Sequence, residues 1–131
     1  MTESVPFDIL TVAEVYTTGY IKGRNFQTDI QHGILSQAFR HEIPPEELFR
    51  AILEPILNHL AAHPKFNDRS SVAIYALQNE SCPLDLLTRA VRCTNRYYAR
   101  YASENPNTPE EVLVEYWLKG GNAKPVRYYP Q

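Results

Sequence analysis

The 131-residue chain lacks the features that mark several large classes of protein. Its 13 basic and 15 acidic residues nearly balance, with a net charge of −2, so it lacks the strong positive charge of many nucleic-acid-binding domains. This balance excludes neither a protein partner nor an RNA partner. No apolar run approaches the roughly 18 residues that a membrane-spanning helix needs. The N-terminus, MTESVPFDIL, has no basic segment followed by an apolar one. We therefore expect a cytoplasmic protein without a membrane partner.

Cysteine is scarce, and the common catalytic motifs are missing from the sequence. The only cysteines are Cys82 and Cys93, a number that fits a reducing cytosol. There is no G-x-S-x-G motif, no glycine-rich phosphate loop and no C-x-x-C pair. His59 and His63 are four residues apart, a spacing that can hold a metal, but no third ligand follows at a standard spacing. We therefore expect no catalytic residue, no metal, no cofactor and no enzymatic activity.

Signals for helices are frequent, whereas signals for strands are weak. Ten prolines spread along the chain favour many short helices over a few long ones. The longest helical stretch is HEIPPEELFRAILEPILNHLAAHP at 41–64, where Pro44 and Pro45 stand at the start of the predicted helix. Pro55 falls inside the same stretch and predicts a kink or a break near Leu53.

Two segments of the chain resemble each other at an offset of 26 residues. Residues 73–87 read AIYALQNESCPLDLL and residues 99–113 read ARYASENPNTPEEVL. The overlay pairs the following residues: Ala73 with Ala99, Tyr75 with Tyr101, Ala76 with Ala102, Asn79 with Asn105, Pro83 with Pro109, and Leu87 with Leu113. Self-similarity at such a period is typical of stacked helical units. Each copy predicts two helices, capped by Asp68 or Ser70 and then Ser81 in the first copy, and by Thr94 or Asn95 and then Thr108 in the second.

Within residues 69–113 this pattern resembles the leucine-rich repeat variant family, whose unit runs roughly V-R-x-x-V-A-x-N-P-x-T-P-x-x-L-L. The best match is the run Asn105 to Pro109 and the Glu-Glu-Val-Leu that follows it. The earlier copy has Glu80 and Cys82 where the pattern has Pro and Thr. The resemblance implies a right-handed stack in which α-helices alternate with shorter helical turns.

The fold expected is all-α: a short right-handed helical-repeat solenoid of about two to three units with an N-terminal helical cap. We expect a single domain over 1–131. Residues 1–62 would form the cap, 63–120 the repeats and 121–131 a flexible tail. Stacked repeats mostly serve as surfaces for other molecules.

One basic run is the candidate binding surface. Arg89, Arg92, Arg96 and Arg100 would form a stripe on a continuous helix, although Thr94-Asn95 is expected to break that helix. The overlay makes Tyr98 and Tyr101 core-like and leaves Tyr97 exposed. The residues expected to bind a partner are Arg89, Arg92, Arg96, Tyr97 and Arg100.

The function expected is non-catalytic protein–protein interaction, as an adaptor or assembly subunit with another protein as partner. A nucleic-acid-binding module that uses the same four arginines is the alternative. A third possibility is self-association through an apolar C-terminal end formed by Tyr116, Trp117, Tyr128 and Tyr129.

Overall fold

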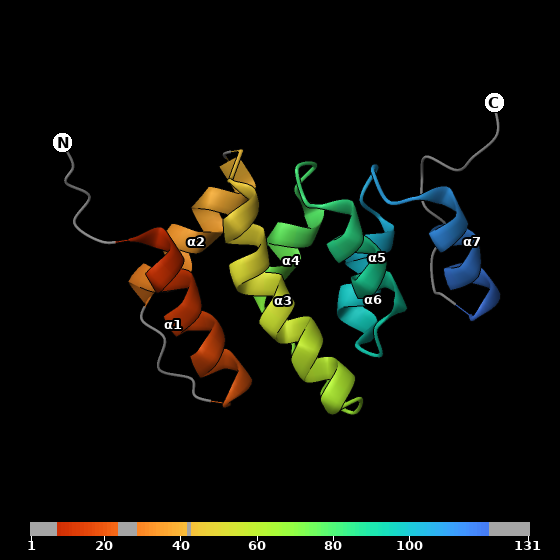
Figure 1. The fold of residues 1–131 in the computed structure, drawn as a ribbon, viewed down its shortest axis with the longest axis horizontal. Coiled ribbons are helices and arrows are strands. Elements are labelled where there is room, and N and C mark those ends of the chain that lie inside the picture. The colour runs from red at the N-terminus through yellow and green to blue at the C-terminus, as the bar shows by residue number, and fades with distance from the viewer. Residues whose placement is uncertain (1–7, 24–28, 42, 121–131) are drawn as a thin grey trace.

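The computed structural model describes residues 8–23, 29–41 and 43–120. Over these residues the protein is all-helical, as the sequence predicts, and contains no strand (Figure 1). The seven helices described there are α1 (Ile9–Ile21), α2 (Asp29–His41), α3 (Glu46–Ala62), α4 (Ser71–Gln78), α5 (Leu84–Arg92), α6 (Arg96–Ser103) and α7 (Glu110–Leu118). None of these described helices has both the length and the apolar character that crossing a bilayer requires. The predicted tail at 121–131, including Tyr128 and Tyr129, lies outside the described residues.

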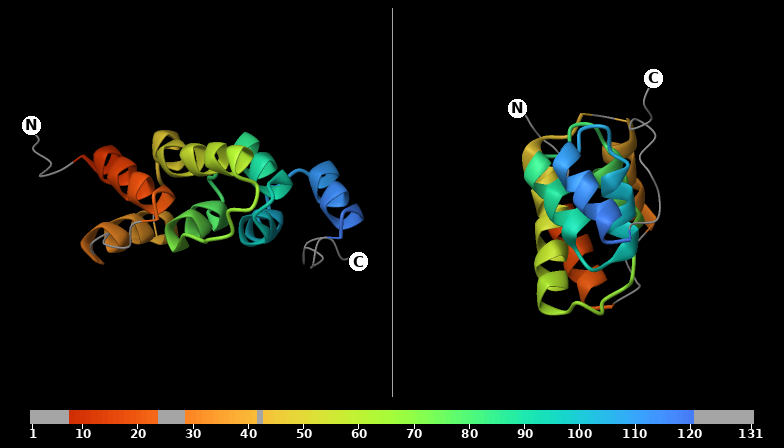
Figure 2. Two further views of the ribbon diagram at one scale, coloured as in Figure 1. Left: turned by 90° about the horizontal axis from the view of Figure 1, so that it is seen from below. Right: turned by 90° about the vertical axis from the view of Figure 1, so that its right-hand side faces the viewer.

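The helices lie in two layers (Figure 2). We call α1, α3, α5 and α7 the odd layer, in which α1 contacts α3, α3 contacts α5 and α5 contacts α7. The even layer is α2, α4 and α6, in which α4 lies between the other two and contacts both. Contacts between α1 and α2, α3 and α4, and α5 and α6 join the layers. The chain thus passes back and forth between the layers while it advances along the long axis of the molecule.

The hydrophobic core runs between the two layers. Its buried side chains come from every described helix and include Ala13, Leu35, Ile52, Leu87 and Val112. Burial of apolar side chains of this kind is the main force that holds such short helices in place. The first three helices therefore share one continuous core with the later four.

Side-chain caps fix where three of the helices begin. Asp8 accepts a hydrogen bond from the Leu10 amide at 3.0 Å at the start of α1. Of the alternatives left open by the sequence, Ser70 caps α4 and Asn95 caps α6. Ser70 accepts from the Ala73 amide at 3.1 Å.

The caps predicted at Ser81 and Thr108 are wrong. The residues before α5 and α7 are Pro83 and Pro109, whose backbones are nearly identical, with φ −58° at both and ψ of 140° and 141°. Proline has a fixed φ and no amide hydrogen, so it starts a helix without needing a capping side chain. The Thr108 hydroxyl instead donates to the Ala102 carbonyl at 2.6 Å, which ties the loop to the end of α6.

Of the kink or break predicted near Leu53, the break does not occur, because α3 continues through Pro55 to Ala62. Proline removes one hydrogen bond of the helix. The side chains on both sides of it remain buried, including Ile52, Leu53, Ile56 and Leu57. Packing of these four side chains holds both halves of the helix against the core.

Candidate interaction surface

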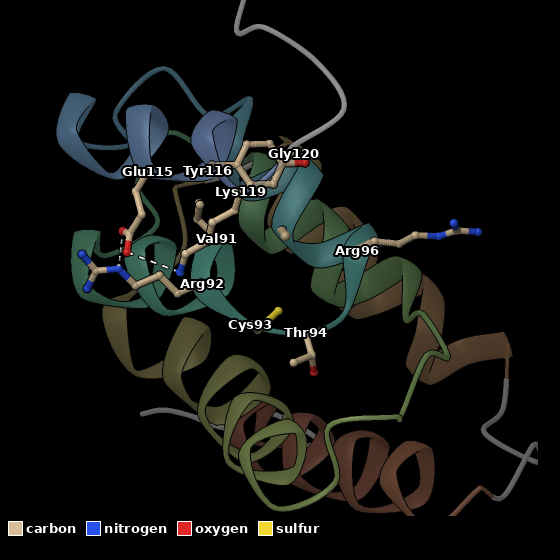
Figure 3. Close-up of a pocket in the computed structure, with 10 residues that line it drawn as sticks. Val91, Arg92, Cys93, Thr94, Arg96, Glu115, Tyr116, Lys119 and Gly120 are labelled. Carbon is tan, nitrogen blue, oxygen red and sulfur yellow. Dashed lines mark hydrogen bonds and ion pairs between the residues drawn. The ribbon is translucent and has the colours of Figure 1, made fainter.

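The structure divides the predicted basic run between the two layers. Helix α5 ends at Arg92 and α6 begins at Arg96, with the expected interruption between them. Arg89 and Arg92 therefore belong to the odd layer, whereas Arg96, Tyr97 and Arg100 belong to the even layer. Figure 3 shows Arg92 directed towards Glu115 and Arg96 directed to the opposite side. The structure does not bring the predicted binding residues together as one stripe.

The two arginines of the odd layer contact neighbouring helices of their own layer. Arg89 donates through Nη2 to Asn58 Oδ1 of α3 at 2.8 Å. Arg92 donates through Nε to Glu115 Oε1 of α7 at 2.9 Å (Figure 3). Both side chains thus link α5 to the helices on either side of it.

A third arginine of the odd layer is engaged by three carboxylates. Arg50 of α3 lies 2.7 Å from Glu46, 2.9 Å from Glu54 and 3.0 Å from Asp85 of α5. The hydrogen bonds from Arg50 lower the pKa of Asp85, since they favour its charged form. Helices α3, α5 and α7 are therefore connected on their solvent side by a series of charged and polar contacts.

Two arginines of the even layer, and Arg69 just before α4, lie over tyrosine rings instead. The guanidinium carbons of Arg69 and Arg96 are 4.9 and 5.5 Å from the centre of the Tyr97 ring. Arg40 of α2 is 5.0 Å from the Tyr75 ring of α4. These distances fall within the range of cation–π attraction.

The arginines over these rings differ from Arg100 in their ion pairing. Arg100 pairs with Glu104 at 3.3 Å, one turn along α6. Among the described residues, no carboxylate forms an ion pair with Arg40, Arg69 or Arg96.

Two asparagines, Asn79 partly buried and Asn105 fully buried, join the ends of the even-layer helices. The Asn79 side-chain amide donates to the Phe39 carbonyl near the end of α2 at 2.8 Å. The Asn105 amide donates to the carbonyls of Leu77 and Asn79, at 2.7 and 2.9 Å. Both asparagines also accept, through Oδ1, the backbone amide two residues on, at 2.8 Å for Asn79 and 2.9 Å for Asn105. The sequence overlay paired these two residues but did not reveal that they join neighbouring helices.

A chain of hydroxyl groups connects the first helix to α4 and α6. The Tyr98 hydroxyl accepts the Ser70 amide at 2.7 Å and lies 2.6 Å from the Tyr20 hydroxyl. The Tyr16 hydroxyl lies 2.7 Å from Ser70 Oγ. Burial raises the pKa of Tyr98 far above its usual value, so the phenol stays protonated. Tyr98 is core-like as predicted, whereas Tyr101 is only half-buried.

The thiols and histidines show no arrangement for chemistry in the described part of the chain. Burial raises the pKa of Cys82 to about 12 and that of Cys93 to about 11, so both thiols are protonated at neutral pH and weakly nucleophilic. The rings of His59 and His63 lie 4.4 Å apart, and partial burial together with His63 lowers the pKa of His59. Over the described residues, no three His, Cys, Asp or Glu side chains gather as metal ligands do.

A surface pocket of about 320 Å³ lies between α5, α6 and α7. Its lining includes Arg92, Cys93, Tyr116 and Lys119 (Figure 3). Arg92 and Lys119 both pair with Glu115 at the rim, at 2.9 and 3.5 Å, and Arg96 is the other cation of the lining. The Cys93 thiol of this lining donates to the Asn95 carbonyl at 3.5 Å.

Comparison of the chain with protein-family models, curated proteins and solved structures found no match. The resemblance to the leucine-rich repeat variant family therefore stays a prediction from the residues alone.

Proposed function

We propose that this chain is a non-catalytic helical-repeat module that binds another protein in the cytoplasm, as an adaptor or assembly subunit. In this proposal the helices form a short right-handed solenoid of two to three units, of the leucine-rich repeat variant kind, and the first three helices form its N-terminal cap. A stack of this type presents long faces of helices, and such faces bind other macromolecules without doing chemistry.

The observation that carries this proposal is the matched role of two asparagines. Asn79 and Asn105, which the overlay pairs, each bond to a carbonyl at the end of the preceding even-layer helix. Each also closes the same turn onto the amide two residues on. Helices α5 and α7 then begin in the same backbone conformation at Pro83 and Pro109. Equivalent residues thus make equivalent joints, as a stack of units requires.

The binding surface of this proposal is Arg96, Tyr97 and Arg100 on the even layer. The predicted residues Arg89 and Arg92 are not part of this surface, because they link α5 to α3 and α7 through Asn58 and Glu115. Interfaces between proteins are enriched in arginine and tyrosine, which makes this part of α6 a suitable surface.

The test is purification of the tagged full chain from cells of its own source, with and without nuclease, at near-physiological salt. We expect a stoichiometric protein that survives nuclease and is reduced in the variant R96A/Y97A/R100A. The variant E110A/E111A, which changes two exposed residues of α7 in the odd layer, serves as the control and should retain the partner.

Two outcomes would contradict the proposal. Stoichiometric nucleic acid that is lost with R96A/Y97A/R100A, and lost steeply with added salt, would favour the alternative of a nucleic-acid-binding module. A second copy of the chain as the only partner, seen as a concentration-dependent dimer in sedimentation, would favour self-association through the end that carries Tyr116 and Trp117.

A further inference from the structure

We infer that the partner presents an acidic, carboxylate-rich segment, and that this segment binds across the even layer on a face formed by Arg40, Arg69, Tyr75, Arg96 and Tyr97. We call this set the arginine–tyrosine face. The inference rests on the proposed function and names the chemistry of the partner.

Charge is distributed unequally between the helices of the two layers. The described helices of the odd layer carry mostly carboxylates: Glu14, Glu46, Glu47, Glu54, Asp85, Glu110, Glu111 and Glu115, against Arg50, Arg89 and Arg92. The helices of the even layer carry one acidic residue, Asp29, against Arg40, Arg96 and Arg100. The helices of the even layer thus carry an excess of positive charge, while the turns beside them carry Asp68, Glu80 and Glu104 against Arg69. Complementary charge favours an acidic partner on that layer.

The three arginines of the face are exposed and contact tyrosine rings. Arg40, Arg69 and Arg96 are exposed, and none of them forms an ion pair with a carboxylate of the described residues. Each lies over a tyrosine ring, which restricts the guanidinium before any partner arrives. Contact with a ring engages the flat face of a guanidinium and leaves its in-plane N–H donors for a carboxylate. Such restriction lowers the entropy lost on binding.

The face fits a carboxylate-rich protein segment better than it fits a nucleic acid. Proteins that bind single strands stack bases on exposed aromatic rings. The rings of Tyr75 and Tyr97 are already within cation–π distance of arginines of this chain. Three separated cations also provide few phosphate contacts. The face therefore suits point contacts with side-chain carboxylates better than a stacked strand.

Carboxylates of the chain itself border the face and limit its extent. Asp68 precedes Arg69, and Glu80 follows the end of α4. Glu104 pairs with Arg100, so a carboxylate of the partner would compete with Glu104 for that arginine. The three unpaired arginines therefore define where carboxylates of a partner would bind.

The experiment places the photo-crosslinking residue p-benzoylphenylalanine in the full chain at one of two exposed positions, in cells of its own source. Ser71 starts α4 beside the arginine–tyrosine face, and Glu111 lies on α7 in the odd layer. We expect the probe at Ser71 to crosslink a protein peptide whose sequence, read by mass spectrometry, is rich in Asp and Glu.

Two variants with the same change in net charge then test the arginines. In R40Q/R69Q/R96Q we expect the crosslink from Ser71 to fall by about tenfold, since each lost charge contact weakens binding. In R50Q/R89Q/R92Q it should stay within about twofold, because these arginines lie on helices of the odd layer, where they contact Glu46, Asn58 and Glu115. Circular dichroism of both variants shows whether each is folded, and a folded R40Q/R69Q/R96Q with an unchanged crosslink overturns the inference.

The remaining outcomes separate the inference from the proposed function. A protein that crosslinks only from the probe at Glu111 overturns the inference of an acidic segment. A peptide that crosslinks from Ser71 but lacks acidic residues does the same. Both results are still consistent with a module that binds another protein. A crosslink from Ser71 that nuclease removes overturns both in favour of a nucleic acid. The absence of any crosslink from either position also overturns both.

Discussion

The two layers of this protein join their helices in opposite ways. In the odd layer, α3, α5 and α7 are linked on the solvent side by Arg50 with Asp85, Arg89 with Asn58, and Arg92 with Glu115. In the even layer, the ends of α2, α4 and α6 are linked by side-chain amides that donate to backbone carbonyls, from Asn79 and Asn105. One layer therefore uses exposed charge for its joints, and the other uses partly or fully buried amides.

The difference explains why the arginines of the two layers have different roles. Exposed ion pairs contribute little to stability and are screened by salt, whereas hydrogen bonds of a buried amide are costly to lose. Because amides hold the even layer together, its arginines are not needed as joints. Arg40, Arg69 and Arg96 contact tyrosine rings, whereas Arg89 and Arg92 link α5 to the neighbouring helices.

The largest effect should come from removing the buried amide joint. Asn105 is 2 % exposed, and Asn105→Ala leaves the Leu77 and Asn79 carbonyls and the Asn107 amide without this partner. Buried polar groups that lose their partner cost about 1–3 kcal/mol each, so we expect a loss of about 3 kcal/mol in the free energy of unfolding. Urea denaturation followed by circular dichroism measures it.

The matched control for this prediction is Asn107→Ala, two residues away. Asn107 is exposed and its side chain donates to the Glu80 carbonyl at 2.7 Å. Its loss should cost less than about 1 kcal/mol, because water replaces an exposed hydrogen bond. Equal losses in the free energy of unfolding of the two variants would mean that burial does not make the hydrogen bonds of Asn105 more important than those of Asn107.

A smaller effect should come from the hydroxyl chain that joins α1 to the even layer. Tyr98→Phe keeps the buried ring but removes the acceptor of the Ser70 amide and the neighbour of the Tyr20 hydroxyl. We expect a loss of about 2 kcal/mol in urea denaturation. Tyr101→Phe, on the same helix and half-buried, should change the free energy of unfolding by less than about 0.5 kcal/mol. A loss for Tyr98→Phe as small as that for Tyr101→Phe would show that the hydroxyl chain contributes little.

The sequence predicted the helices well because their signals are local. Apolar periodicity, capping by Asp8, and prolines before α5 and α7 all act within a few residues of each helix start. It left open whether the helix would kink or break at Pro55. The helix α3 continues there, because tertiary packing of the residues around the proline outweighs one lost hydrogen bond.

The sequence did not predict which partners the candidate arginines contact, for a related reason. The overlay placed Tyr97 as exposed, whereas its side chain is half-buried. No local pattern shows that Arg92 faces Glu115 or that Arg69 and Arg96 contact the same Tyr97 ring. These partners lie 23 and 27 residues apart in the chain. Which arginines serve the fold and which face outward is decided only when the helices stack.

The smallest effect concerns the charged joint between α3 and α5, and it should depend on pH. Arg50 lowers the pKa of Asp85 below its value in the unfolded chain, which is about 3.9. A group with a lowered pKa in the folded state stabilises the protein above its unfolded pKa, and this contribution is lost as the pH falls through the folded pKa. Asp85→Asn removes the titrating group, so it removes that dependence.

We therefore expect Asp85→Asn to be slightly less stable than the wild type at pH 7 and at pH 5, by the same amount. The difference should shrink as the pH falls below about 3.9, because the unfolded wild type then takes up a proton on Asp85 before the folded protein does. Urea denaturation across this pH series measures it, and the difference at pH 7 should also shrink with added salt, because Asp85 is exposed. A difference that stays constant down to pH 3 would mean that charge on Asp85 does not hold α5 to α3. Hydrogen bonds would then join the helices in both layers, and those of the odd layer would differ only in being exposed to water.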